Sequence, residues 1–179
     1  MNLIEKYSKA PECSEYNKQS IDKLNKEQKN HLEKLLEKME NSGATRPLDW
    51  ALSEITENIP QFGRFLMLKG LYDIINDVEE NMGLADDIDE SYENDIFEVA
   101  EQLKETIGEE GLNNFLKSYA KGIMWQVTNL IDEGNYNSNG EPNWALKELA
   151  NENDNKSERF INGLHESFNE FEEELRDPR

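Results

Sequence analysis

The sequence predicts a mainly α-helical protein, and three observations support that prediction. Apolar residues recur every three or four positions through most of the 179-residue chain, which is the period of an amphipathic helix. Proline and glycine stand between these stretches, where helices begin and end. Seven Phe, six Tyr and three Trp supply burial for a folded core. We expect an irregular leader at residues 1–16 and then a single domain over 17–179, a bundle of about five to six helices.

The local signals place each helix in order. Ser20 suits the cap of the first helix and Pro47 the first turn of the second, while Gly83 and Gly134 suit helix ends. The expected helices cover residues 20–41, 47–59, 61–81, 84–107, 112–133 and 163–175. The fifth is expected to bury Leu112, Phe115, Leu116, Tyr119, Ile123, Val127 and Leu130, and the fourth Ala85, Ile88, Tyr92, Ile96, Val99 and Leu103.

The segment before the last helix allows two interpretations. Trp144, Leu146 and Glu148 alternate in the manner of a strand, and a very polar stretch follows them, which predicts a short C-terminal β-hairpin near residues 144–161. A short helix over 142–150 explains the apolar positions about as well. Both interpretations stay open from the sequence.

The formal net charge of −20 is concentrated in one part of the chain. Residues 71–112 hold fifteen acidic residues and one basic residue, Lys104, whereas residues 1–70 are neutral overall. Residues 141–179 add a further net charge of −6. Such a field repels nucleic-acid phosphates and anionic membranes and speeds encounter with a basic protein. We therefore expect no direct nucleic-acid binding, no membrane binding and a basic protein partner.

Three further features predict a cytoplasmic protein. No stretch approaches the roughly 18 to 20 continuous apolar residues of a membrane span, and the first residues lack the apolar core of a signal peptide. The single cysteine, Cys13, has no second cysteine with which to form an internal disulfide.

The sequence favours neither a metal site nor a cofactor. Only two histidines are present, His31 and His165, and neither follows a Glu at the Glu-x-x-His spacing or belongs to a close ligand pair. Residues 87–98 approach a calcium loop, because oxygen-bearing side chains occupy its six ligand positions. However, Tyr92 stands where the loop needs glycine and Asn94 where it needs an apolar residue. The same residues fit a continuous amphipathic helix, so we expect no calcium there.

Enzyme signatures are also missing from the sequence. It contains no Gly-x-Ser-x-Gly nucleophile motif and no glycine-rich phosphate loop. Adjacent carboxylates are frequent, but 39 acidic residues produce such pairs without any catalytic role. We therefore expect a non-enzymatic protein.

A binding surface is the stronger prediction. Phe97 points away from the apolar stripe of its expected helix and lies among glutamates, the arrangement of an interface anchor ringed by steering charges. The alternative is that another helix covers Phe97, and the same question applies to Trp125. The predicted partner-binding residues are Asp73, Asp77, Glu80, Asp86, Asp87, Glu90, Glu93, Phe97, Glu98, Glu101 and Glu105.

In size, acidity and helical character the chain resembles the small immunity proteins that bacteria keep in the cytoplasm to block nuclease toxins. The resemblance is one of composition and involves no specific motif. It implies a protein that neutralises a basic partner, such as a cognate toxin, with residues 73–105 as the principal contact. Two other classes stay open: a DNA mimic or regulatory adaptor that binds nucleic-acid-binding proteins, and a helical enzyme or small-ligand-binding protein.

Overall fold

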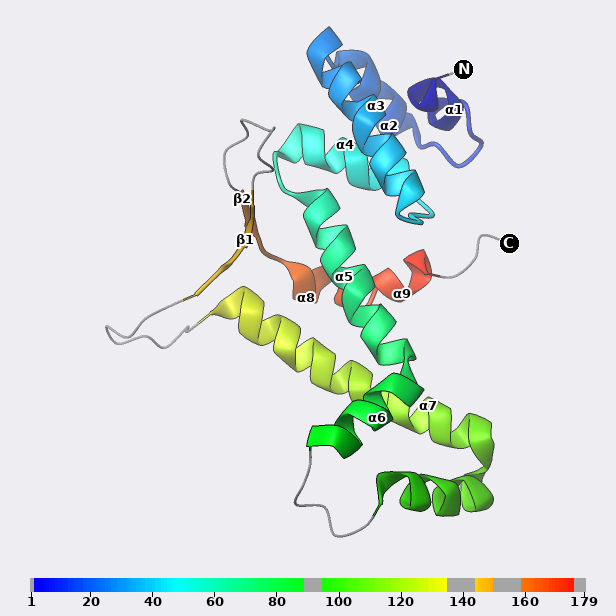
Figure 1. Ribbon diagram of the computed structural model, residues 1–179. Helices are drawn as coiled ribbons and strands as arrows, with labels where there is room; N and C mark the ends of the chain where they lie inside the picture. Colours follow the sequence, from blue (N-terminus) through cyan, green and yellow to red (C-terminus); the bar gives the residue numbers. More distant parts are fainter. Residues whose placement is uncertain (1, 89–94, 135–143, 150–158, 176–179) are drawn as a thin grey trace. The chain divides into compact units, whose positions relative to one another are not determined.

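The computed structural model confirms the mainly α-helical class (Figure 1). It describes residues 2–88, 95–134, 144–149 and 159–175. These residues contain nine helices and one two-stranded sheet, so the helices are more numerous than the expected five to six. The chain divides into two compact units, unit 1 (residues 1–68 and 131–179) and unit 2 (residues 69–130). The single domain expected over residues 17–179 stays a prediction.

Unit 1 begins with four helices. They are α1 (Leu3–Ser8), α2 (Glu15–Lys23), α3 (Lys26–Asn41) and α4 (Pro47–Glu57). The first three begin at side chains that accept a hydrogen bond from the first turn, Asn2, Ser14 and Asn25. Pro47 stands at the start of α4, as its fixed φ angle predicts. The first expected helix is therefore two helices, because the Asn25 cap starts a new one.

The expected leader contains a helix and is tied to the rest of unit 1. The backbone N–H groups of Leu3 and Ile4 donate to the two carboxylate oxygens of Glu33 on α3, at 2.6 and 3.1 Å. Tyr7 Oη donates to Glu40 at 3.0 Å. These contacts join residues about thirty positions apart, which no local sequence pattern signals.

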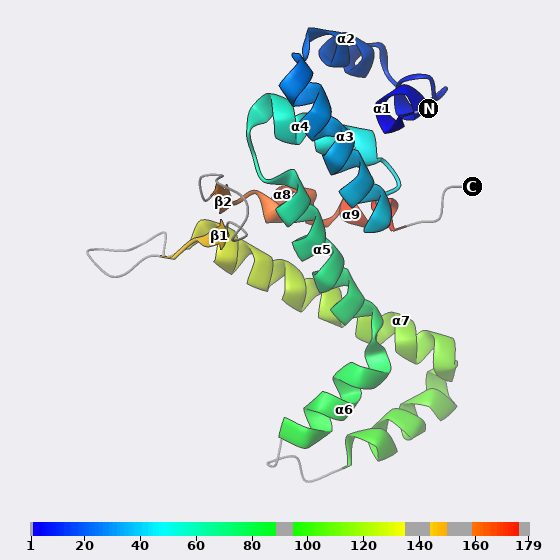
Figure 2. The ribbon, with the colours of Figure 1, turned by 45° about the horizontal axis from the view of Figure 1, so that its top comes forward.

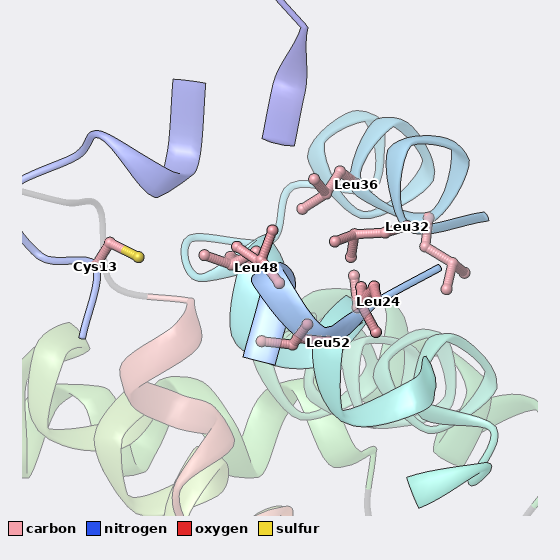
Figure 3. Close-up of a cluster of buried hydrophobic side chains, with 9 residues drawn as sticks. Cys13, Leu24, Leu32, Leu36, Leu48 and Leu52 are labelled. Atoms are coloured by element: carbon pink, nitrogen blue, oxygen red, sulfur yellow. The ribbon is translucent and has the colours of Figure 1, made fainter. Parts of the chain in front are cut away.

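The core of unit 1 lies between α2, α3 and α4 (Figure 3). α3 packs along α4, and the apolar stripes of both helices face each other. Cys13 belongs to this cluster and is buried, although the sequence placed it in the leader. The buried members are Cys13, Ile21, Leu24, Leu32, Leu35, Leu36, Leu48, Ala51 and Leu52.

A second, aromatic cluster joins the C-terminal helices to α4 and α5 (Gln61–Asn76). The rings of Trp50, Phe65 and Phe171 contact one another edge to face, with centroids 5.3 to 6.0 Å apart. Leu164 and Phe168 are completely buried. The helix expected over residues 163–175 is present as two short helices, α8 (Leu164–Phe168) and α9 (Phe171–Glu174).

The structure decides between the two interpretations of the preceding segment. β1 (Leu146–Glu148) and β2 (Arg159–Ile161) pair antiparallel, with Leu146 opposite Ile161. The strands of the predicted hairpin are therefore present. For the described residues of 142–150, the alternative prediction of a helix is wrong. A Cβ on Gly63 of α5 would lie 3.0 Å from Ile161 Cδ1, so a side chain there would require the Ile161 side chain to shift.

Two buried carboxylates hold distant segments of unit 1 together. Glu54 on α4 is 3% exposed and accepts from Arg159 Nη2 and from the Phe62 N–H, both at 2.8 Å. Glu174 on α9 is 1% exposed and accepts from the N–H groups of Thr45 and Arg46 at 2.8 Å. Arg46 Nε also donates to Glu174 at 3.1 Å. Glu174 therefore satisfies backbone N–H groups at the start of α4, where Arg46 supplies no side-chain cap.

Unit 2 consists of the end of α5, the helix α6 (Val78–Ile88) and most of α7 (Ile96–Glu133). Helical geometry in α7 is interrupted at Gly108, whose φ of 78° lies in the region that favours glycine. Figures 1 and 2 show the chain turning sharply between the two parts of α7. No helix within the described ranges is long and apolar enough to cross a membrane.

The helix boundaries of unit 2 differ from the sequence prediction. The third expected helix, 61–81, ends at Asn76. A new helix, α6, follows Asp77, because the Asp77 carboxylate caps it by accepting a hydrogen bond from the Glu80 N–H at 3.2 Å. Gly83, the expected terminator, lies inside α6. The fourth expected helix, 84–107, falls on the end of α6 and the start of α7, with residues 89–94 outside the described part of the chain.

The Glu174 contact generates a stability prediction. Glu174→Gln replaces one buried carboxylate oxygen with an NH2 group. That group cannot accept the hydrogen bond from Arg46, and the side chain loses its negative charge. We expect the free energy of unfolding to fall by about 1–3 kcal/mol, measured by urea unfolding followed by far-UV circular dichroism. The matched control is Glu173→Gln, because Glu173 is exposed on the same helix. Equal effects of the two substitutions would contradict the structural role of Glu174.

Candidate protein-interaction site

The predicted partner-binding residues that the structure describes all lie in unit 2. Their carboxylates are exposed on α5, α6 and the first part of α7. Glu90 and Glu93 lie outside the described residues. The exposed members of the set are Asp73, Asp77, Glu80, Asp86, Asp87, Phe97, Glu98, Glu101 and Glu105.

Two of the acidic residues begin helices. Asp77 caps α6, as described above, and Asp95 caps α7 by accepting from the N–H groups of Phe97 at 2.8 Å and Glu98 at 3.4 Å. Negative charge at a helix N-terminus is also favoured by the helix dipole. These acids therefore have a structural role in addition to the surface charge that they contribute.

Most of the acidic charge of unit 2 is not balanced within the unit. Residues 69–130 contain fifteen acidic residues and four lysines, a net charge of −11, whereas the longer unit 1 carries −9. Lys69 pairs with Asp73 at 2.8 Å, and Lys104 lies 3.4 Å from Glu101 and 3.8 Å from Glu109. These exposed pairs are weak because solvent screens them. The surface of unit 2 is therefore strongly negative.

Phe97 and Trp125, the two aromatic residues that the sequence could assign either to the core or to an interface, are neither buried nor fully exposed. Phe97 is 41% exposed and Trp125 is 40% exposed. Phe97 lies in the first turn of α7, directly before Glu98 and one turn before Glu101. A ring with this exposure among carboxylates has the composition of an interface anchor, but the exposure alone does not test that role.

The structure corrects the expectation that the second part of α7 is buried. Leu112 is buried as predicted, but several of the apolar residues that follow it are more than one third exposed. Unit 2 has too few helices to cover this stripe from every side. The exposed residues of α7 that the sequence placed in a core are Leu103, Phe115, Tyr119, Ile123, Val127 and Leu130.

Part of this uncovered surface forms a groove within unit 2. We call it the α6–α7 groove; it has a volume of about 320 Å³ and opens to solvent. One wall comes from the end of α5 and from α6, and the other from the start and the second part of α7. It is lined by Ile74, Ile75, Val78, Asn81, Met82, Ala85, Ile96, Leu116, Tyr119, Ala120, Ile123 and Met124. The periodicity identified most of these positions as apolar, but not that they remain uncovered.

Unit 1 contains a partly buried polar cluster formed by Arg64, Asp132, His165 and Ser167. The Asp132 carboxylate lies 2.8 Å from His165 Nδ1 and accepts from the His165 N–H at 2.7 Å. Ser167 Oγ accepts from Arg64 Nη2 at 2.9 Å. Burial lowers the pKa of the Arg64 guanidinium below its usual value. The bonds of this cluster join α5, α7 and α8 within unit 1.

Metal binding gains no support from the described part of the chain. No group of three or more His, Cys, Asp or Glu side chains there is arranged to hold a metal ion. Of the calcium-like segment 87–98, Asp87 lies in α6 and Asp95 and Glu98 begin α7. Its central residues, 89–94, lie outside the described residues.

Comparison with known proteins identifies no relative: no protein-family model, curated protein or solved structure matches the chain.

The environment of Cys13 generates a reactivity prediction. Burial raises the pKa of the Cys13 thiol above its usual value, so the fraction present as thiolate at pH 8 is smaller than in the unfolded chain. We expect the folded protein to react with a disulfide reagent such as DTNB at least tenfold more slowly than the protein in guanidinium chloride, measured by absorbance. Equal rates would contradict the buried position of Cys13.

Proposed function

We propose that this protein is a non-enzymatic binding protein that captures a basic protein partner and neutralises it by covering its cationic surface. The observation that carries the proposal is the surface of unit 2, where exposed carboxylates lie on α6 and on the first part of α7, and the half-exposed Phe97 lies in the first turn of α7. Unpaired surface charge of one sign steers an oppositely charged partner, and a partly exposed aromatic ring supplies contact area once the partner arrives.

A nuclease toxin is the partner that fits this proposal best. Nucleases grip nucleic acid with Lys and Arg side chains that neutralise phosphates. An acidic surface competes for the same groups and thereby blocks access of nucleic acid to the toxin. Such inhibition requires fast association, which depends on ionic strength because the steering is electrostatic. The proposal includes a cytoplasmic location, where an immunity-type inhibitor meets its toxin.

Affinity capture from a lysate of the source cells tests the proposal. The full chain is immobilised and exposed to the lysate at low and at high salt, and the retained proteins are identified by mass spectrometry. One basic protein, whose purified activity falls when the chain is added at a stoichiometric ratio, would support the proposal. Several salt-labile partners would instead favour the DNA mimic. A bound metabolite with no protein partner would overturn the proposal in favour of a ligand-binding protein or an enzyme.

Charge reversal on unit 2 is expected to slow association with the captured partner. The variant Asp87→Lys, Glu98→Lys, Glu101→Lys removes steering charge from α6 and α7, so the association rate at low salt falls by about tenfold or more. Surface plasmon resonance measures this rate. The matched control reverses three exposed acids of unit 1, Glu12, Asp22 and Glu37, and leaves the same net charge. Similar rates for both variants would show that the location of the charge is irrelevant.

Phe97→Ala separates an interface anchor from a core residue. Because the ring is 41% exposed, we expect the free energy of unfolding to fall by less than the roughly 3–5 kcal/mol of a fully buried Phe. Binding of the captured partner should weaken by about tenfold or more, as for an anchor residue. Calorimetry and urea unfolding measure the two effects. The control is Phe160→Ala on β2, which is 59% exposed in unit 1. Unchanged binding would exclude Phe97 from the interface.

A further inference from the structure

The α6–α7 groove has two amphipathic walls. On the second part of α7, the lining residues Leu116, Tyr119, Ala120, Ile123 and Met124 recur at intervals of three and four, so they share one face of the helix. On α6, the lining residues Val78, Met82 and Ala85 share a face in the same way. The groove therefore runs between helices that both present apolar stripes.

Only two of the lining side chains carry polar groups, Asn81 and Tyr119. Asn81 is the one amide among the lining residues, and its Nδ2 donates to the backbone carbonyl of Ile74 at 2.5 Å. Met82 and Met124 lie on opposite walls. Methionine side chains are flexible and polarisable, so they adapt to apolar groups of different shapes. Such a lining selects for apolar side chains and offers little to orient a polar ligand.

The groove is too open to enclose a small molecule. Ligand pockets bury about 70–90% of a ligand and fall in the range of roughly 300–1,000 Å³. The volume of about 320 Å³ lies at the lower end of that range. In addition, the lining residues Ile74, Tyr119 and Ile123 are 46%, 64% and 42% exposed. An open groove between two apolar stripes instead matches the groove mode of helix recognition.

The charges on the helices that line the groove favour a basic occupant. Asp73 and Asp77 flank the lining residues of α5, and Asp86 and Asp87 directly follow Ala85 on α6; all four are exposed. The opposite wall carries Lys117 and Lys121, and Lys121 lies 5.9 Å from the centre of the Tyr72 ring. A second copy of the chain would bring another unit of net charge −11 against these carboxylates. A basic occupant is therefore favoured over self-association.

We propose that the α6–α7 groove binds one amphipathic helix of the basic partner, an inference that rests on the proposed function. The apolar residues of that helix, spaced at i, i+3 or i+4, and i+7, lie in the groove between Met82 and Met124. Its Lys and Arg residues extend toward the carboxylates of α5 and α6. Electrostatic steering then brings the partner to unit 2, and the groove supplies the apolar contact that retains it.

A designed peptide tests the groove without requiring the natural partner. The probe is a fluorescein-labelled peptide of about 18 residues, roughly five helical turns, composed of Leu and Lys with Leu on one helical face. The first control has the same composition in scrambled order, and the second replaces Lys with Glu. Fluorescence anisotropy with the full chain should give a dissociation constant at least about tenfold lower for the amphipathic Leu/Lys peptide than for either control.

Substitutions in one wall locate the binding site. Ile123→Ser removes an apolar side chain from the groove, whereas Val127→Ser removes a similar, 37% exposed side chain of the same helix that does not line it. We expect about a tenfold or larger loss of peptide affinity for Ile123→Ser and less than about twofold for Val127→Ser. Tyr119→Ser is a second groove variant, chosen because its 64% exposed side chain contributes least to folding. Circular dichroism checks that each variant is folded.

The outcomes separate this inference from the proposed function. Equal binding of the scrambled and amphipathic Leu/Lys peptides, or equal effects of the Ile123 and Val127 substitutions, would overturn the groove while leaving an acidic binding surface. A wild-type dimer that Ile123→Ser dissociates, seen by analytical ultracentrifugation, would also overturn it, because a second copy would be the occupant. Specific peptide binding without any basic partner from the lysate would support the groove and overturn the proposed function.

Discussion

The pairing of the buried Glu54 carboxylate is the interaction on which the arrangement of unit 1 depends. A carboxylate that is 3% exposed destabilises a fold by several kcal/mol unless its oxygens are bonded. Glu54 meets this constraint with Arg159, 105 positions along the chain, and with the Phe62 N–H at the start of α5. One side chain therefore determines where α5 begins relative to α4 and where β2 lies. Glu174 has the same role at the other end of α4, and the edge-to-face rings of Trp50, Phe65 and Phe171 pack α4, α5 and α9 against one another.

Unit 2 contrasts with unit 1 in both its charges and its apolar residues. Unit 1 buries leucines in a continuous core and bonds its buried carboxylates, whereas unit 2 exposes both carboxylates and long apolar stripes. The two features act over different distances. Charge acts over about one Debye length, roughly 8 Å at physiological salt, and apolar surface contributes only at direct contact. A surface that has both carboxylates and apolar stripes therefore suits a partner that charge first attracts and apolar contact then retains.

Several elements followed from the sequence because local signals specify them. Pro47 marked the start of α4, the alternation around Leu146 was consistent with β1, and Gly108 interrupts helical geometry where a break was expected. The errors at the boundaries of α6 and α7 share one cause. Asp77 and Asp95 were counted as surface charge, but each caps a helix, so the boundaries of α6 and α7 were misplaced. Aspartate suits both roles, and the choice depends on whether the preceding backbone turns, which the composition of the segment does not reveal.

For the candidate site, the sequence by itself determined which residues are acidic and that they concentrate in residues 71–112. It also determined that the apolar residues of α7 have helical spacing and that Phe97 lies off their stripe. Those properties are local, so counting and periodicity recover them. Only the tertiary structure decided that the stripe from Leu116 to Met124 remains partly uncovered and shares a groove with α6. Helical spacing identifies an apolar face but not the helix that covers it. Whether an apolar face is covered depends on which segments pack against it, and contacts between residues far apart in the sequence determine that packing.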